Sequence, residues 1–165
     1  MSKRSKAKKR QASKKKKKEP ILFYEKDAPH YGFTNFSPHS VRYENRVYPT
    51  SEHLFQSFKF LEYNPTIAEH IRTYSSRPSV AFSEAKRYQS EVRPDWLIIN
   101  IEKMKEVLWL KFYQHKDLQS ELLATGDAEL IENSPVDAFW GNGKNGDGRN
   151  ELGKALMDIR SLLRG

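Results

Sequence analysis

The segment Asp137-Ala138-Phe139-Trp140-Gly141-Asn142-Gly143 places a carboxylate three residues before a tryptophan and leads through a glycine-rich stretch into the last helical pattern of the chain. A carboxylate can stabilise a cationic sugar or activate water, and an indole can stack on a flat base. Glycines let backbone amides approach a ligand, and a helix N-terminus favours phosphate. The segment therefore predicts either a ligand site or a tryptophan-anchored core turn beside a glycine-rich surface loop.

The helices around this segment are indicated by apolar periodicity and by prolines, which are tolerated just before or at a helix start. The last helix is expected over about 150–163, and a longer one is expected over 95–115. Thr50 or Ser51 can cap a helix that runs to about Glu62. Shorter helices are expected over 66–74, 79–89 and 117–124.

Extended structure is expected mainly before residue 50. Ile21–Tyr24 and Val41–Tyr48 carry residues that suit strands, and Glu44-Asn45 can fold the second piece into a hairpin. Glu129–Glu132 is expected to be extended or a turn. These elements together predict a mostly helical α+β domain over residues 21–165, with helices packed around a few short strands.

The composition fits one domain without disulfide or metal chemistry. The 165 residues suit a single hydrophobic core. The absence of cysteine excludes disulfides, thiolate metal sites and a cysteine nucleophile, and the five histidines show no metal-ligand spacing. We therefore expect no metal and no cofactor. No apolar run is long enough to span a bilayer and no secretory segment follows the basic N-terminus, so we expect no membrane contact and an intracellular, cytoplasmic protein.

The net charge of +8 is concentrated at the N-terminus. Residues 1–19 hold 11 of the 29 Lys and Arg residues and one of the 21 acids, which gives +10 there and leaves −2 for the remainder. Residues 1–20 carry almost nothing apolar, and we expect a disordered tail. Its interpretations are an electrostatic arm for nucleic acid, a nuclear localisation signal if the source is eukaryotic, or a solubilising extension. The nearly neutral body argues against a broad nucleic-acid-binding face on the domain.

Glu52, Gln56 and Lys59 occupy positions i, i+4 and i+7 of a predicted helix rich in phenylalanine. This spacing puts the three side chains on one helical face. The line is either a solvated face with a weak side-chain ladder or the lining of a pocket that offers an acid or base, an amide and a cation. Spacing alone leaves both interpretations open.

Several motifs are dispersed along the chain. They are Phe33-Thr34-Asn35-Phe36, the stretch 48–59, Asp95-Trp96, Lys111-Phe112 and the segment that starts at Asp137. In this order they resemble the YbiA-like family, also called the NADAR superfamily, from about Phe23 to about Leu163. Known members are N-glycosidases: some hydrolyse phosphoribosylamino-pyrimidine intermediates of riboflavin synthesis, and others remove ADP-ribose from modified nucleobases. The resemblance implies N-glycosidic chemistry on a nucleotide-like small molecule or on ADP-ribosylated nucleic acid, and it does not choose between them.

An N-glycosidase must stabilise positive charge at the anomeric carbon while the base departs. Glu52 and Asp137 are the candidates for the acid or base and for the charge-stabilising carboxylate. Trp140 can stack on the base or the sugar. Gln56 or Asn150 can hydrogen-bond the base edge or the ribose hydroxyls.

Other motif residues are candidates for holding the rest of the substrate. Lys59 can neutralise a phosphate or, if burial lowers its pKa, attack the opened sugar as a Schiff-base nucleophile. The backbone of Gly141 and Gly143 can hold a phosphate. Arg160, which matches a late arginine of the family, is expected either to bind phosphate or to form a buried ion pair, and Asn35 can contact the ligand. The motif aromatics expected in the core are Phe33, Phe36 and Trp96.

Two other classes of function use the same features. A non-catalytic ADP-ribose or NAD-binding module would use the pocket without turnover. A nucleic-acid-binding protein would act through residues 1–19, with the domain as a scaffold. The first class should bind a ligand without consuming it, and the second should lose its activity with the tail.

Overall fold

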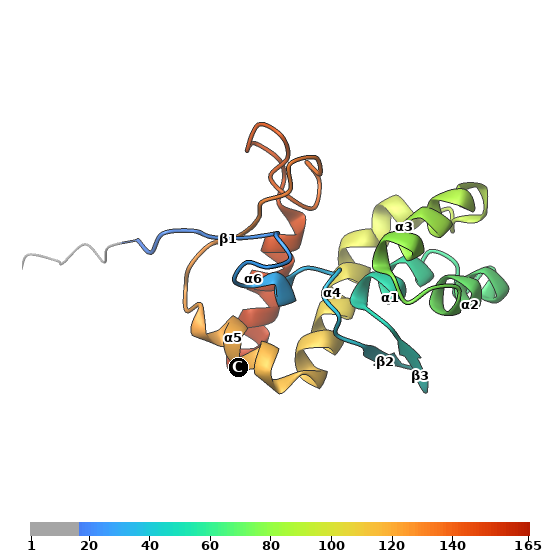
Figure 1. Cartoon of the computed structure of the whole chain (residues 1–165), viewed down its shortest axis with the longest axis horizontal. Helices are drawn as coiled ribbons and strands as arrows, with labels where there is room; N and C mark the ends of the chain where they lie inside the picture. The colour runs from blue at the N-terminus through green and yellow to red at the C-terminus, as the bar shows by residue number, and fades with distance from the viewer. Residues whose placement is uncertain (1–16) are drawn as a thin grey trace, which may run out of the picture.

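A computed structural model describes residues 17–165. The predicted class, a mostly helical α+β domain with a few short strands, is confirmed (Figure 1). Most of the basic tail predicted for residues 1–20 lies outside the described residues. The elements are β1 (Ile21–Phe23), the 3-10 turn η1 (Tyr31–Phe33), β2 (Val41–Tyr43), β3 (Arg46–Tyr48), α1 (Ser51–Ser57), α2 (Pro65–Thr73), α3 (Pro78–Arg87), the 3-10 turn η2 (Gln89–Glu91), α4 (Trp96–Gln114), α5 (Lys116–Ala124), β4 (Leu130–Glu132) and α6 (Glu151–Arg164).

Local signals explain the hairpin and the helix that follows it. Glu44 and Asn45 have positive φ angles of 46° and 64°, the conformation of the tight turn that joins antiparallel β2 and β3. Thr50 Oγ1 then accepts a hydrogen bond from the His53 amide at 3.3 Å and caps α1. The predicted hairpin and cap are both confirmed.

Helix α1 is shorter than the sequence predicts. It ends at Ser57 rather than near Glu62, because the amides of Lys59 and Phe60 bond to carbonyls three residues back instead of four. This tighter spacing turns the chain out of the helix. Lys59 therefore lies just past the end of α1 and not within it.

The parallel pairing of β1 with β4 joins the two ends of the domain. Ile21 lies opposite Leu130 and Phe23 lies opposite Glu132. Helix α6 packs against β4, and a Cβ at Gly153 would clash with the Leu130 carbonyl oxygen. A glycine is therefore required where this helix crosses the strand.

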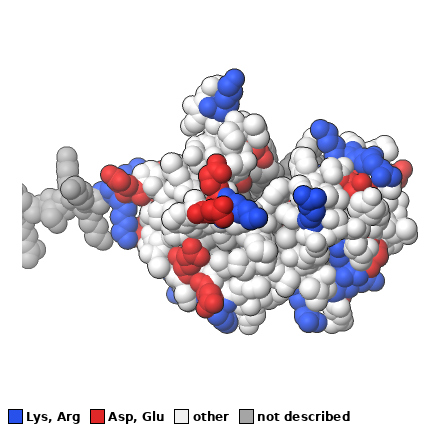
Figure 2. Space-filling view, in the orientation of Figure 1, with Lys and Arg blue, Asp and Glu red and all other residues white. Residues whose placement is uncertain are grey.

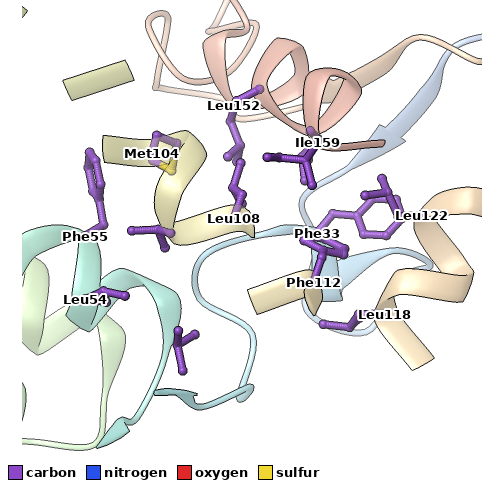
Figure 3. Close-up of a cluster of buried hydrophobic side chains, with 14 of the residues drawn as sticks. Phe33, Leu54, Phe55, Met104, Leu108, Phe112, Leu118, Leu122, Leu152 and Ile159 are labelled. Atoms are coloured by element: carbon purple, nitrogen blue, oxygen red, sulfur yellow. The ribbon is translucent and has the colours of Figure 1, made fainter. Parts of the chain in front are cut away.

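Helix α4 stands at the centre of the core, with α6 on one side and α1 on the other (Figure 1). Side chains from these helices meet those of η1 and α5 in one continuous cluster, part of which Figure 3 shows. A smaller cluster lies between α2 and α3. The main cluster includes Phe33, Phe55, Trp96, Met104, Leu108, Phe112, Leu122, Leu152 and Ile159.

The charged residues of the described body are mixed in sign. Figure 2 shows blue and red residues interleaved on one face, without one sign dominating it. Among the helices of residues 17–165, none is long and apolar enough to cross a membrane.

Candidate functional site

A cavity of about 400 Å³ opens where the segments after β1, η1 and β4 meet α1, α4 and α6. That volume suits a nucleotide-sized ligand. Five of the residues predicted from the sequence line it, namely Asn35, Glu52, Gln56, Asp137 and Trp140. They come from three separate parts of the chain, so the fold brings together motifs that are dispersed in the sequence.

Glu52 and Gln56 form the deep polar part of this cavity. Both are nearly inaccessible, with 6% and 3% of their surfaces exposed, and Gln56 Nε2 donates to Glu52 Oε1 at 2.7 Å. The interpretation of this face as a solvated ladder is therefore wrong. Gln56 Oε1 has no hydrogen-bond partner among the described residues, so the amide keeps an acceptor that a ligand donor can use.

Burial raises the pKa of the Glu52 carboxyl, and the Gln56 hydrogen bond and the Lys59 charge oppose that shift. Burial lowers the pKa of the Lys59 ammonium, partly offset by Glu52. Lys59 packs with its ammonium 5.7 Å from the centre of the Trp96 ring and does not line the cavity. The structure thus places Lys59 as a charge near Glu52 and outside the cavity lining.

Asp137 organises the turn that carries Trp140. Its Oδ1 accepts from the amides of Phe139 at 2.9 Å and Trp140 at 2.8 Å, and its own amide donates to Ser134 Oγ at 2.9 Å. The Trp140 indole packs edge-on against Phe55, with ring centres 5.4 Å apart. Trp140 therefore packs against the core along one edge while it also lines the cavity.

Glu132 is a further carboxylate of the cavity, and the sequence did not indicate it as a site residue. Burial, together with the charges of Asp137 and Glu52, raises the pKa of Glu132 to about 8. Its Oε2 is shielded from solvent and has no hydrogen-bond partner among the described residues. The available signal was a carboxylate at the end of a short apolar strand, only five residues before Asp137.

The glycine-rich segment does not present a phosphate cradle at the start of α6. The amides of Glu151 and Leu152, in the first turn of that helix, donate to the carbonyls of Phe139 and Trp140. Gly141 fills a tight position instead, since a Cβ there would lie 2.7 Å from the Glu132 carbonyl oxygen. Neither Gly141 nor Gly143 lines the cavity, so the segment packs against the strand and leaves those two helix amides unavailable to a phosphate.

Asn150 and Arg160 also lie outside the cavity lining. Asn150 Oδ1 accepts from the Glu132 amide at 3.0 Å, and its Nδ2 donates to the Leu130 carbonyl at 2.8 Å, which ties α6 to β4. Arg160 Nη1 donates to Thr125 Oγ1 and to the Ala128 carbonyl, two residues before β4. Both side chains hold the framework, and Arg160 does so through neutral acceptors rather than through the expected phosphate or ion pair.

The mouth of the cavity is apolar. Phe36, expected in the core, lines the cavity with 40% of its surface exposed, because its neighbours Phe33 and Asn35 occupy the inward positions. Phe82 and Val136 are also in the lining and are 50% and 81% exposed. These exposed apolar groups beside Trp140 offer flat and aliphatic surface to a base.

A buried lysine supports the segment that carries Asn35 and Phe36. Lys111 Nζ donates to the Thr34 carbonyl at 2.7 Å and to Ser37 Oγ at 2.8 Å. These two acceptors bracket the two cavity residues in sequence. Burial lowers the pKa of the Lys111 ammonium to about 7, because its hydrogen-bond partners are neutral.

A second cavity of about 470 Å³ lies between η1 and the start of α5. Its histidines are already engaged: His39 Nδ1 with Ser37 Oγ, and His115 Nε2 with the Ser40 carbonyl. Gln114 is held by both backbone groups of Arg42. The first cavity, with its unpaired carboxylate and amide oxygens, is therefore the candidate site.

The model of the NADAR domain family matches residues 22–164. A riboflavin biosynthesis protein of Vibrio vulnificus is 41% identical over 145 residues, which cover 88% of this chain and 39% of that protein. An N-glycosidase of Nostoc punctiforme is 36% identical over 144 residues, which cover 87% of this chain and 92% of that protein.

A solved structure shares the fold. The NMR structure of the Escherichia coli protein YbiA superposes with a TM-score of 0.80 at 36% sequence identity, over 90% of this chain and 87% of that one. The short strands and helices around α4 are therefore an arrangement that a related protein also adopts.

Proposed function

Because this chain belongs to the NADAR domain family, we propose that it is an N-glycosidase that hydrolyses the N-glycosidic bond of a nucleotide-like substrate. One observation carries the proposal: a cavity of nucleotide size gathers Glu52, Glu132 and Asp137 beside the Trp140 indole. Several carboxylates next to a flat stacking surface suit a reaction in which a sugar cation forms as a base departs.

The proposed roles follow from how each group is held. Glu52, buried and fixed by Gln56, supplies the acid or base. Asp137 stabilises positive charge at the anomeric carbon, since two backbone amides hold its carboxylate rigidly. Trp140 stacks on the base, and Gln56 Oε1 and Asn35 bond the base edge or the ribose.

Lys26 is the proposed phosphate partner. Among the described residues that line the cavity, it is the one Lys or Arg, and it is exposed at the entrance. Lys59, set behind Glu52, keeps that carboxylate more acidic than burial alone would. The alternative for Lys59 is a Schiff base with the opened sugar, which borohydride would trap as a covalent adduct.

Two classes of substrate are proposed. Phosphoribosylamino-pyrimidines fit the size of the cavity and the apolar mouth, and some relatives are named for riboflavin biosynthesis. ADP-ribosylated nucleobases carry the same bond, and a basic N-terminal arm would draw a nucleic-acid substrate to the domain.

The test is mass spectrometry of the products after incubation with each substrate class, with Glu52→Gln as the matched inactive control. A free base together with a released sugar phosphate or ADP-ribose is the expected result. Ligand binding without consumption would identify a non-catalytic nucleotide-binding module instead. Absence of both binding and turnover with either class would refute the proposal.

A further inference from the structure

We propose that Glu132 is the acid that protonates the departing base and that Glu52 is the base that accepts a proton from water; this inference rests on the N-glycosidase function proposed above. The two carboxylates lie in the same cavity and come from opposite parts of the domain, β4 and α1.

The backbone of Glu132 is fixed on three sides. It pairs with Phe23 of β1, its amide donates to Asn150 Oδ1 at 3.0 Å, and its carbonyl accepts from the Asn142 amide at 2.9 Å. A side chain carried by so constrained a backbone delivers its carboxyl to one place. Such positioning is what proton transfer to a leaving group requires.

The two glutamates differ in their hydrogen bonds, and the difference favours the ionised form of Glu52 and the protonated form of Glu132. Glu52 Oε1 receives the Gln56 amide at 2.7 Å, which favours the ionised form. Glu132 Oε2 is shielded from solvent and receives no donor from the described residues. Carboxylates that share one poorly solvated site do not all ionise together, and the one without donors retains the proton. Burial raises the pKa of both carboxyls, that of Glu132 to about 8, and the Gln56 hydrogen bond opposes the shift only at Glu52.

The other charged groups that line the cavity with Glu132 come from three parts of the chain. Glu52 belongs to α1, Asp137 to its own loop, and Glu25 and Lys26 to the segment after β1. Helices α4 and α6 contribute apolar side chains to the lining. Lys26 is the one cation among these described groups, and its exposure screens its effect on the buried carboxyl.

The bond between the anomeric carbon and the base nitrogen breaks, and its electron pair stays on the nitrogen, which takes the proton from Glu132. The oxygen of one water bonds to the anomeric carbon, and that water gives a proton to Glu52. Transfer of this proton to Glu132, directly or through solvent, restores both groups. The net change is consumption of one water and release of free base and sugar.

The experiment compares Glu132→Gln with Glu129→Gln. Glu129 immediately precedes β4, is exposed and lies outside the cavity lining, so it offers a matched control for the same substitution. On a phosphoribosylamino-pyrimidine, Glu132→Gln should lower kcat by about 10²–10⁴ with KM little changed, the usual effect of losing a general acid. The unmodified protein and Glu129→Gln should lose activity as pH rises through about 8, and the residual activity of Glu132→Gln should not show this decline.

A second substrate separates an acid from a structural role. The second substrate is a ribosyl phosphate whose leaving group is a cationic pyridinium. That group departs as a neutral pyridine and therefore needs no proton from an acid. Glu132→Gln should spare this substrate relative to the pyrimidine, and that ratio does not depend on the fraction of folded protein. Turnover of the pyrimidine equal to that of Glu129→Gln, an unchanged alkaline decline, or equal losses on both substrates would overturn the role of Glu132. Failure of the unmodified protein to cleave any substrate would instead overturn the proposed function.

Discussion

Replacing Lys111 with Met should abolish a specific pH dependence of the free energy of unfolding. In the native protein the Lys111 ammonium is buried between the Thr34 carbonyl and Ser37 Oγ, and its pKa falls to about 7. An unfolded lysine titrates near about 10.4. Between these values the unfolded chain binds the proton and the native protein does not, so the free energy of unfolding rises with pH. The buried charge lowers the free energy of unfolding most below pH 7, and it has no effect above the pKa of the unfolded lysine.

The magnitude follows from the width of the window. Each pH unit inside it should add about 1.4 kcal/mol to the free energy of unfolding, so about 2 kcal/mol accumulates from about pH 8 to about pH 9.5. Glu132, with its pKa raised to about 8, still titrates in the lower part of this window, and Tyr43, whose pKa is raised to about 12, stays protonated in the native protein. These groups contribute equally in Lys111→Met and cancel in the difference between the two proteins.

The assay is urea unfolding followed by far-ultraviolet circular dichroism at several pH values in this window. The unmodified protein should gain stability relative to Lys111→Met as pH rises, because Met carries no titrating charge. Parallel pH profiles for the two proteins would contradict the lowered pKa of Lys111, since they would mean that Lys111 keeps its proton in the native state or titrates alike in both states.

The remaining predictions concern the cavity and the tail. Glu52→Gln should keep the melting temperature and lower kcat by about 10²–10⁴, and near-normal turnover would remove Glu52 from the mechanism. Asp137→Asn should lower kcat with KM little changed, because Asn retains the acceptor for the Trp140 amide, whereas Asp137→Ala should also raise KM; identical steady-state kinetics for the two would contradict this division. Trp140→Ala should weaken ligand binding by roughly 1–3 kcal/mol in calorimetry, unless a loss of melting temperature reveals a mainly structural side chain. Deletion of residues 1–19 should leave turnover of small substrates and the melting temperature intact while it weakens nucleic-acid binding and flattens its salt dependence; a large fall in melting temperature would show that the arm is structural.

Local features of the fold could be predicted from the sequence because neighbouring residues determine them. The turn at Glu44-Asn45, the Thr50 cap and the helix starts at Pro65 and Pro78 all occur where the sequence indicates. The common face of Glu52 and Gln56 follows from helical geometry and is confirmed by their hydrogen bond.

Features that depend on distant contacts could not be predicted. The pairing of β1 with β4 leaves no periodic signal in either three-residue strand, and the cavity position of Glu132 depends on that pairing. Motif membership did not separate ligand contacts from framework contacts. Asn150 was expected at the ligand, and Arg160 at a phosphate or in a buried ion pair, but both side chains donate to backbone carbonyls in or near β4. Only the three-dimensional contacts distinguish the two kinds of residue.

The pairing of β1 with β4 has a consequence for how the protein acquires activity during folding. The two strands are separated by roughly a hundred residues, and closing so long a loop delays contact formation relative to local helices and hairpins. The cavity takes walls from the segments after both strands. During synthesis, most helices can form on the ribosome before the segment after β4, which supplies the second cavity wall, has been translated. In refolding, helical signal should therefore return ahead of catalytic competence, which appears only when the first and last parts of the domain meet.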